Sequence, residues 1–233
     1  MGAIYLVRHG QASFGSSRYD RLSEIGRQQG TRLGQYWSER GLRIDRWVTG
    51  SLERQIDTAA LALEAMQQAA DVERDPRFNE FDHVRLTAAL LPRLAEGDPL
   101  IQDYLAARVD RLAVFQRVFE KVVTAWTEQD WGGVVESWPD FASRVNAALD
   151  ALIASAEGGM NVAVVTSGGP ITAMLAHLLA LSPAHAFQMN WSIANASITK
   201  IQFSQRGGRR SLGYFNQYHY LQNGADRTLV TLR

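Results

Sequence analysis

The sequence predicts an α/β fold, a three-layer α/β/α sandwich whose sheet is mostly parallel. Apolar and β-branched runs alternate along the chain with stretches of helical periodicity, as in a parallel sheet covered by helices. The first run, residues 3–7, is nearly all apolar, which is typical of a strand buried on both faces. The 233 residues, 46% of them hydrophobic, are enough to bury the core of one large domain.

Serine residues mark the start of three predicted helices, because a serine side chain can accept a hydrogen bond from a free amide of the first turn. These helices cover residues 23–41, 51–68 and 137–156. A fourth, apolar helix starts at the Gly-Gly-Pro sequence that ends at Pro170, which we place at the first helical position. The other predicted strands are 46–49, 72–74, 161–166 and the two arms of a hairpin, 197–203 and 211–215.

No strand pattern is present between about residues 82 and 131. Residues 86–94 and 100–126 are predicted to be helical because apolar side chains recur there at three- and four-residue spacing. We therefore predict one domain over residues 1–233, with a helical insertion at about 82–131. This insertion is expected over the edge of the sheet where a ligand would bind.

Composition excludes several classes of function. The 24 basic and 24 acidic residues give a formal net charge of zero, so no global field attracts nucleic acid or acidic membranes. The absence of cysteine excludes disulfides, thiolate metal sites and cysteine nucleophiles. No apolar run is long enough to span a bilayer, and the first residues are expected to form a strand and not a secretory leader. The expectation is a cytoplasmic protein.

The strongest functional motif is Arg8-His9-Gly10, at the carboxyl end of the first predicted strand. Ligands of parallel α/β sheets bind at this edge. A guanidinium beside an imidazole, followed by a glycine that permits close backbone approach, suits an anionic substrate attacked by imidazole. The alternative is a strand-end ion pair with a solvated histidine.

Two further helix starts favour anion binding. Arg54 falls in the first turn of a predicted helix, where free amides and the helix dipole favour anions and a guanidinium adds a planar donor fork. Ser167-Gly168-Gly169 joins a buried strand to a helix, and its amides can line a second anion pocket. The alternatives are an ordinary exposed arginine and a simple tight turn.

Together these motifs resemble the histidine phosphatase superfamily, also called the phosphoglycerate mutase-like family. The segments that carry the resemblance are spread over nearly the whole chain. They are Leu6 to Gln11, Leu22 to Arg27, Ser51 to Arg54 with Thr58-Ala59, Glu80, Glu136-Ser137 with Arg144-Val145, Ser167 to Gly169, Asn195 to Thr199, and Asn216 to His219.

The resemblance implies roles for individual residues. His9 would be the nucleophile that becomes phosphorylated, Arg8 and Arg54 would hold phosphate, and Glu80 would be the proton donor. Two arginines can neutralise the oxygens of a transferring phosphoryl group without a metal. Glu80 would protonate the leaving alkoxide and later activate water, although a plain loop carboxylate is the alternative for this residue.

The sequence departs from the family at two places. Ser167 stands where the family normally has a second histidine, so a neutral hydroxyl replaces a charged donor. The stretch 14–17 lacks the Trp-Asn element of the family's sugar-phosphate mutases, which weakens a mutase assignment. His83, close to Glu80, is an auxiliary candidate for the missing imidazole, with a surface histidine as the alternative.

We therefore predict an enzyme, a metal-independent phosphatase that hydrolyses a small phosphomonoester through a phosphohistidine intermediate. Ser167 and Gly168 are expected to add to phosphate binding. The alternatives are a phosphoglycerate mutase-like phosphoryl transfer and a degenerate scaffold that binds a phosphorylated ligand without turnover. No cofactor, metal, nucleic acid or membrane is expected as a partner, and a homodimer is one option for the oligomeric state.

Overall fold

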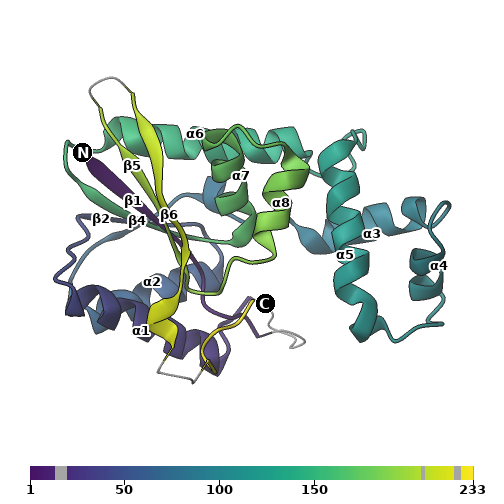
Figure 1. Ribbon diagram of the computed structural model, residues 1–233, viewed down its shortest axis with the longest axis horizontal. Helices are drawn as coiled ribbons and strands as arrows, with labels where there is room; N and C mark the ends of the chain where they lie inside the picture. Colours follow the sequence, from purple (N-terminus) through teal and green to yellow (C-terminus); the bar gives the residue numbers. More distant parts are fainter. Residues whose placement is uncertain (14–19, 206–207, 223–226, 233) are drawn as a thin grey trace.

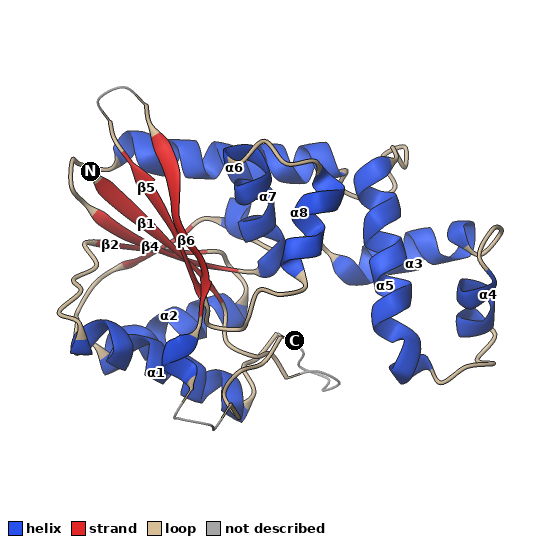
Figure 2. Ribbon diagram, viewed as in Figure 1, coloured by secondary structure: helices blue, strands red, loops and turns tan. Residues whose placement is uncertain are grey.

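A six-stranded mixed sheet forms the centre of the protein (Figures 1 and 2). This computed structural model describes residues 1–13, 20–205, 208–222 and 227–232. The strand order is β3-β2-β4-β1-β5-β6, in which β3, β2, β4 and β1 are parallel, β5 is antiparallel to β1, and β6 is antiparallel to β5. The strands are β1 (Gly2–Arg8), β2 (Arg46–Thr49), β3 (Val72–Arg74), β4 (Asn161–Thr166), β5 (Ile198–Phe203) and β6 (Arg210–Gln217). The predicted α/β fold is thus confirmed.

Helices cover both faces of the sheet, as Figure 1 shows. One face packs against α1 (Glu24–Glu39) and α2 (Glu53–Ala65), and the other against α6 (Trp138–Ser155) and α7 (Gly168–Leu178). Successive side chains of a strand point to opposite faces, and β1 therefore contributes to both cores. Tyr5 belongs to the α1–α2 core, with its ring 5.9 Å from that of Trp37, whereas Leu6 belongs to the other core.

The insertion predicted at about 82–131 consists of α3 (His83–Leu94), α4 (Pro99–Leu105) and α5 (Arg111–Glu128). In Figure 2 these helices project from one side of the sandwich, and α5 packs against both α3 and α8 (Pro183–Asn190). The prediction of one helix over 100–126 was wrong. Ala107 has a left-handed backbone (φ 55°) and the side chain of Asp110 caps a new helix, so the chain turns there.

The starts of the helices show which local signals were reliable. Ser23 and Ser137 are N-caps as predicted, accepting hydrogen bonds from amides three residues on. Ser51 is not a cap, because its hydroxyl accepts a hydrogen bond from the Asn79 side chain and α2 begins after Leu52. Helix α7 begins at Gly168, so Pro170 takes the third helical position and not the first.

None of the helices in the described part of the chain combines the length and the apolar character that crossing a bilayer requires. Part of the turn between β5 and β6 lies outside the described residues, as does the stretch 14–17 that bears on a mutase assignment.

Candidate active site

The predicted site residues converge at the carboxyl ends of β1 and β4. These strands pair in parallel, so that Arg8 lies opposite Thr166, and the His9 amide donates to the Thr166 carbonyl at 2.8 Å. His9 and Ser167 therefore follow neighbouring strands at the same edge of the sheet. Helix α2 brings Arg54 to this edge, and the loop between the short 3-10 helix Pro76–Phe78 and α3 brings Glu80.

The His9 imidazole is held as one defined neutral tautomer. Its Nδ1 lies 2.7 Å from the Gly10 carbonyl, which can only accept, so Nδ1 carries the proton. Its Nε2 accepts a hydrogen bond from Arg54 Nε at 3.0 Å. Burial and the charges of Arg54 and Arg8 lower the pKa of His9 well below its ordinary value, against the opposite effect of the Gly10 carbonyl. Nε2 is thus an unprotonated nitrogen beside two cations.

Backbone contacts fix the position of this nucleophile. Gly10 approaches α1 so closely that a Cβ atom there would lie 2.4 Å from the Gly26 carbonyl oxygen. The Gly10 amide donates to Thr58 Oγ1 at 2.9 Å, and the Asn195 side chain donates to the His9 carbonyl at 3.2 Å. The motif glycine is therefore required by packing.

The two arginines are anchored by different partners. Arg54 is 6% exposed, and its Nη1 forms an ion pair with Asp20 at 2.5 Å. Arg8 donates from Nη1 to the carbonyl oxygens of Ile193 and Leu232. Asp20 holds one edge of the Arg54 guanidinium, and the Nε of Arg54 is therefore directed at His9. Asp20 was missed by the sequence analysis because no local signal links it to Arg54.

Glu80 is a carboxyl group whose pKa is raised above that of an exposed glutamate. Its two oxygens accept hydrogen bonds from the amides of Gly169 at 3.0 Å and Phe81 at 3.2 Å. Burial raises the pKa of Glu80 and outweighs these amides and the Arg54 charge, which act in the opposite direction. Gly169 is needed for this contact, because a Cβ there would lie 2.0 Å from Glu80 Oε1.

Ser167 and Gly168 lie at the start of α7, as expected. A Cβ on Gly168 would lie 2.4 Å from Asn190 Oδ1 and 3.9 Å from Arg8 Nε, which places this glycine beside a phosphate-binding candidate. Ser167 is fully buried, and its hydroxyl accepts a hydrogen bond from Gln55 Nε2 at 2.9 Å. Gln55 is a second residue that the sequence analysis missed.

His83 lies within electrostatic range of Arg54. It is half-buried at the start of α3, and burial together with the charge of Arg54 lowers its pKa, against the effect of Asp82. Its ring meets that of Phe119 edge-on at 6.3 Å, and Phe119 lies 5.8 Å from Trp191. Ring contacts thus lead from His83 to an aromatic side chain of α5 and to Trp191, which follows α8.

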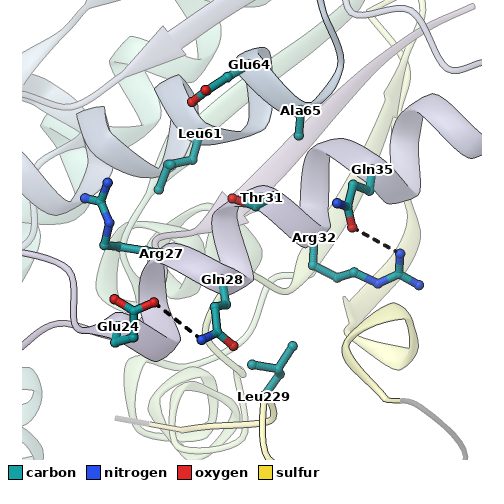
Figure 3. A pocket seen from close by; sticks show the side chains of 10 residues that line it. All are labelled: Glu24, Arg27, Gln28, Thr31, Arg32, Gln35, Leu61, Glu64, Ala65 and Leu229. Atoms are coloured by element: carbon teal, nitrogen blue, oxygen red, sulfur yellow. Dashed lines mark hydrogen bonds between the residues drawn. The ribbon is translucent and has the colours of Figure 1, made fainter.

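The geometry suits transfer of an anionic group to His9 Nε2. Among the described residues, no cluster of three or more His, Asp or Glu side chains is arranged to bind a metal ion. A groove of about 680 Å³ lies elsewhere, between α1 and α2, and Figure 3 shows that its walls include Arg27, Thr31 and Leu61. None of the predicted site residues lines this groove.

Comparisons with known proteins point to one family. The family model described as "Histidine phosphatase superfamily (branch 1)" matches residues 4–216. A 2,3-bisphosphoglycerate-dependent phosphoglycerate mutase of Streptococcus pneumoniae is 27% identical over 205 residues, which are 78% of this chain and 86% of that protein.

Solved structures share the fold over almost the full length. A phosphoglycerate mutase from Bacillus anthracis has a TM-score of 0.66 at 22% identity, covering 94% of each chain. A mycobacterial glucosyl-3-phosphoglycerate phosphatase has a TM-score of 0.62 at 25% identity, covering 93% of this chain and 99% of that one. A phosphoserine phosphatase from Entamoeba histolytica has a TM-score of 0.65 at 18% identity, covering 95% and 100%.

Proposed function

We propose, from the premise that this chain belongs to the histidine phosphatase superfamily, that it is a phosphatase acting on a phosphomonoester through a phosphohistidine on His9. One observation supports the proposal above all others. His9 Nε2 is unprotonated, buried and flanked by the charges of Arg54 and Arg8, while Nδ1 is fixed by the Gly10 carbonyl. This is what an imidazole needs in order to attack a phosphoryl group.

In the first step the phosphoryl group moves from the substrate oxygen to His9. The P–O bond to the alcohol breaks as the bond between phosphorus and Nε2 forms, and Glu80 gives its proton to the leaving oxygen. Arg54 turns from Nε2 to the phosphoryl oxygens, where it and Arg8 offset the negative charge. The raised pKa of Glu80 keeps its proton available for this step.

In the second step water regenerates the enzyme. The ionised Glu80 takes a proton from a water molecule as its oxygen attacks phosphorus, and the bond to Nε2 breaks. Inorganic phosphate leaves, and Glu80 is protonated again. Because Arg54 and Arg8 supply the positive charge, the proposal requires no metal ion or other cofactor.

The alcohol part of the substrate is expected to lie against the insertion. His83, Phe119 and Trp191 form a continuous set of ring contacts that begins within reach of the Arg54 charge. All three are partly exposed. We propose a small phosphorylated substrate whose leaving group packs against these rings, in a protein of the cytoplasm that needs neither nucleic acid nor a membrane.

A mutase is the second candidate, and the relative from Streptococcus pneumoniae favours it. A scaffold without turnover is the third, because Ser167 offers no charge. Release of inorganic phosphate from a chromogenic ester separates an enzyme from a scaffold, and interconversion of phosphoglycerate isomers identifies a mutase. The proposal expects phosphate release across a panel of phosphomonoesters, with no isomer interconversion; the opposite pair of results would overturn it.

A further inference from the structure

We propose that Gln55 is a positioning residue that holds the Ser167 hydroxyl as a hydrogen-bond donor to the phosphoryl group. This inference rests on the proposed function and extends it to the position where the family normally has a second histidine. Both side chains are fully buried, and they meet at 2.9 Å across the gap between α2 and the end of β4. Together the two residues would supply a neutral hydrogen-bond donor in place of the charged histidine that the family normally has here.

The orientation of the Gln55 amide follows from its backbone partners. Its Nε2 lies 3.3 Å from the Phe78 carbonyl, which can only accept, and its Oε1 lies 3.4 Å from the Leu52 amide, which can only donate. The nitrogen therefore faces Ser167. The opposite orientation of the amide would place its oxygen against the Phe78 carbonyl and its nitrogen against the Leu52 amide. Gly50 leaves the room for this side chain, because a Cβ there would lie 2.0 Å from Gln55 Oε1.

This orientation makes Ser167 an acceptor toward Gln55 and leaves its own proton for another group. Ser167 precedes α7, yet its side chain does not cap that helix. Within the described part of the chain the hydroxyl proton of Ser167 has no acceptor. A buried hydroxyl usually uses its proton, so an acceptor that arrives with the substrate is the simplest way to satisfy it.

The location of Ser167 indicates which acceptor that is. Ser167 follows Thr166, whose carbonyl accepts from the His9 amide, so the serine lies on the strand next to the nucleophile. The next two residues contact the rest of the site, Gly168 lying near Arg8 and Gly169 touching Glu80. A phosphoryl group on His9 would bring oxygen atoms, which are acceptors only, into this space.

The attacking nitrogen of His9 is covered by a neighbouring side chain, and this affects how the donor acts. His9 and Arg54 are only 7% and 6% exposed, and the Arg54 guanidinium covers the nitrogen that attacks. Phosphoryl transfer to His9 must displace this hydrogen bond, because Nε2 can bond to phosphorus only when its lone pair is free. The donor therefore acts on the bound and transferring phosphoryl group and contributes little to the first encounter.

A double-mutant cycle tests the pair, with kcat/KM for para-nitrophenyl phosphate as the readout. Ser167→Ala removes the donor, and we expect a loss on the order of 10²-fold, the scale for one preorganised hydrogen bond. Gln55→Met keeps the side-chain length and leaves the hydroxyl free to rotate, for which we expect about a tenfold loss. The double variant should be no worse than Ser167→Ala alone, since the two residues act as one unit.

Gln68→Met is the matched control. Gln68 lies just beyond the other end of α2 and also donates from Nε2 to a backbone carbonyl, that of Ile44, at 2.6 Å. We expect it to lower the thermal unfolding temperature without changing kcat/KM. If Gln55 served only packing, the fold-losses of kcat/KM in the two single variants would multiply in the double variant. This outcome overturns the inference. Full activity in Ser167→Ala also overturns it.

Binding of orthovanadate, measured by calorimetry on the same proteins, separates this inference from the proposed function. If the parent protein hydrolyses no phosphomonoester, the proposed function has failed, and vanadate affinity then tests the pair alone. Weaker binding in both single variants, with no further weakening in the double variant, supports the pair. Unchanged vanadate affinity in the single variants, or losses of affinity that multiply in the double variant, contradict it.

Discussion

Replacing Glu80 with glutamine should lower kcat/KM far more when the leaving group needs a proton than when it does not. Glu80 is the proposed acid, and its raised pKa keeps it protonated over a wider pH range than an exposed glutamate. An alkoxide leaves poorly without a proton, whereas para-nitrophenolate is a stable anion. Glu80→Gln removes the proton but retains the size of the side chain and one of its oxygens.

The contacts of Glu80 set the size of the effect. Both carboxyl oxygens accept from backbone amides, Gly169 at 3.0 Å and Phe81 at 3.2 Å, and the substituted amide can satisfy only one of them. Losing one such hydrogen bond costs about 1 kcal/mol, or about fivefold, for every substrate. General acid catalysis contributes a further 10²–10⁴-fold, on the order of 3–5 kcal/mol, for an alkyl ester alone. The two losses should therefore differ by at least about 10²-fold.

The assay is kcat/KM for glycerol phosphate and para-nitrophenyl phosphate, measured from pH 4 to 8, roughly the range around the ordinary pKa values of glutamate and histidine. His9 must be unprotonated, so the rate falls as the pH drops through its lowered pKa. Glu80 must be protonated, so the rate for glycerol phosphate falls as the pH rises through its raised pKa. Glu80→Gln should abolish this second decline. Equal losses for both esters would refute the assignment of Glu80 as the acid.

Three other predictions test the charges around His9. Arg54→Ala should lower kcat/KM by on the order of 10²-fold, about 3 kcal/mol, and an unchanged rate would exclude Arg54 from transition-state binding. EDTA should leave the rate unchanged while orthovanadate inhibits, and a loss in EDTA that a divalent ion restores would refute the two-arginine mechanism. His83→Ala should reduce the rate more than Ser167→Ala does if His83 replaces the missing imidazole; a silent His83→Ala, together with a gain in Ser167→His, would show that His83 is a bystander.

Much of the fold could be predicted because its signals are local. The apolar run of β1, the serine caps of α1 and α6, and the strand β4 before two glycines each depend on a few adjacent residues. The left-handed turn at Ala107, which divides the predicted helix 100–126, has no glycine or asparagine to mark it. Helix α8 is short, and its cap Ser182 and Pro183 were visible but carried too little periodic pattern to be recognised.

The site was predictable to the same extent. His9 follows a strand and Arg54 begins a helix, so their motifs placed them at one edge of the sheet, whereas Glu80 was identified only through the family resemblance. Asp20 and Gln55 could not be found in this way, because their importance lies in contacts with Arg54 and with Ser167, 34 and 112 residues away in the sequence. Such contacts follow from the path of the whole chain and not from a local pattern.

The phosphohistidine on His9 is the central claim, and trapping it is the most direct test. Rapid mixing with labelled substrate, quenching in base and peptide mapping should locate one phosphoryl group on the peptide that contains His9, stable in base and lost in acid. His9→Ala should abolish both this label and turnover while keeping the thermal unfolding transition. Label on another residue, or full turnover in His9→Ala, would contradict the account.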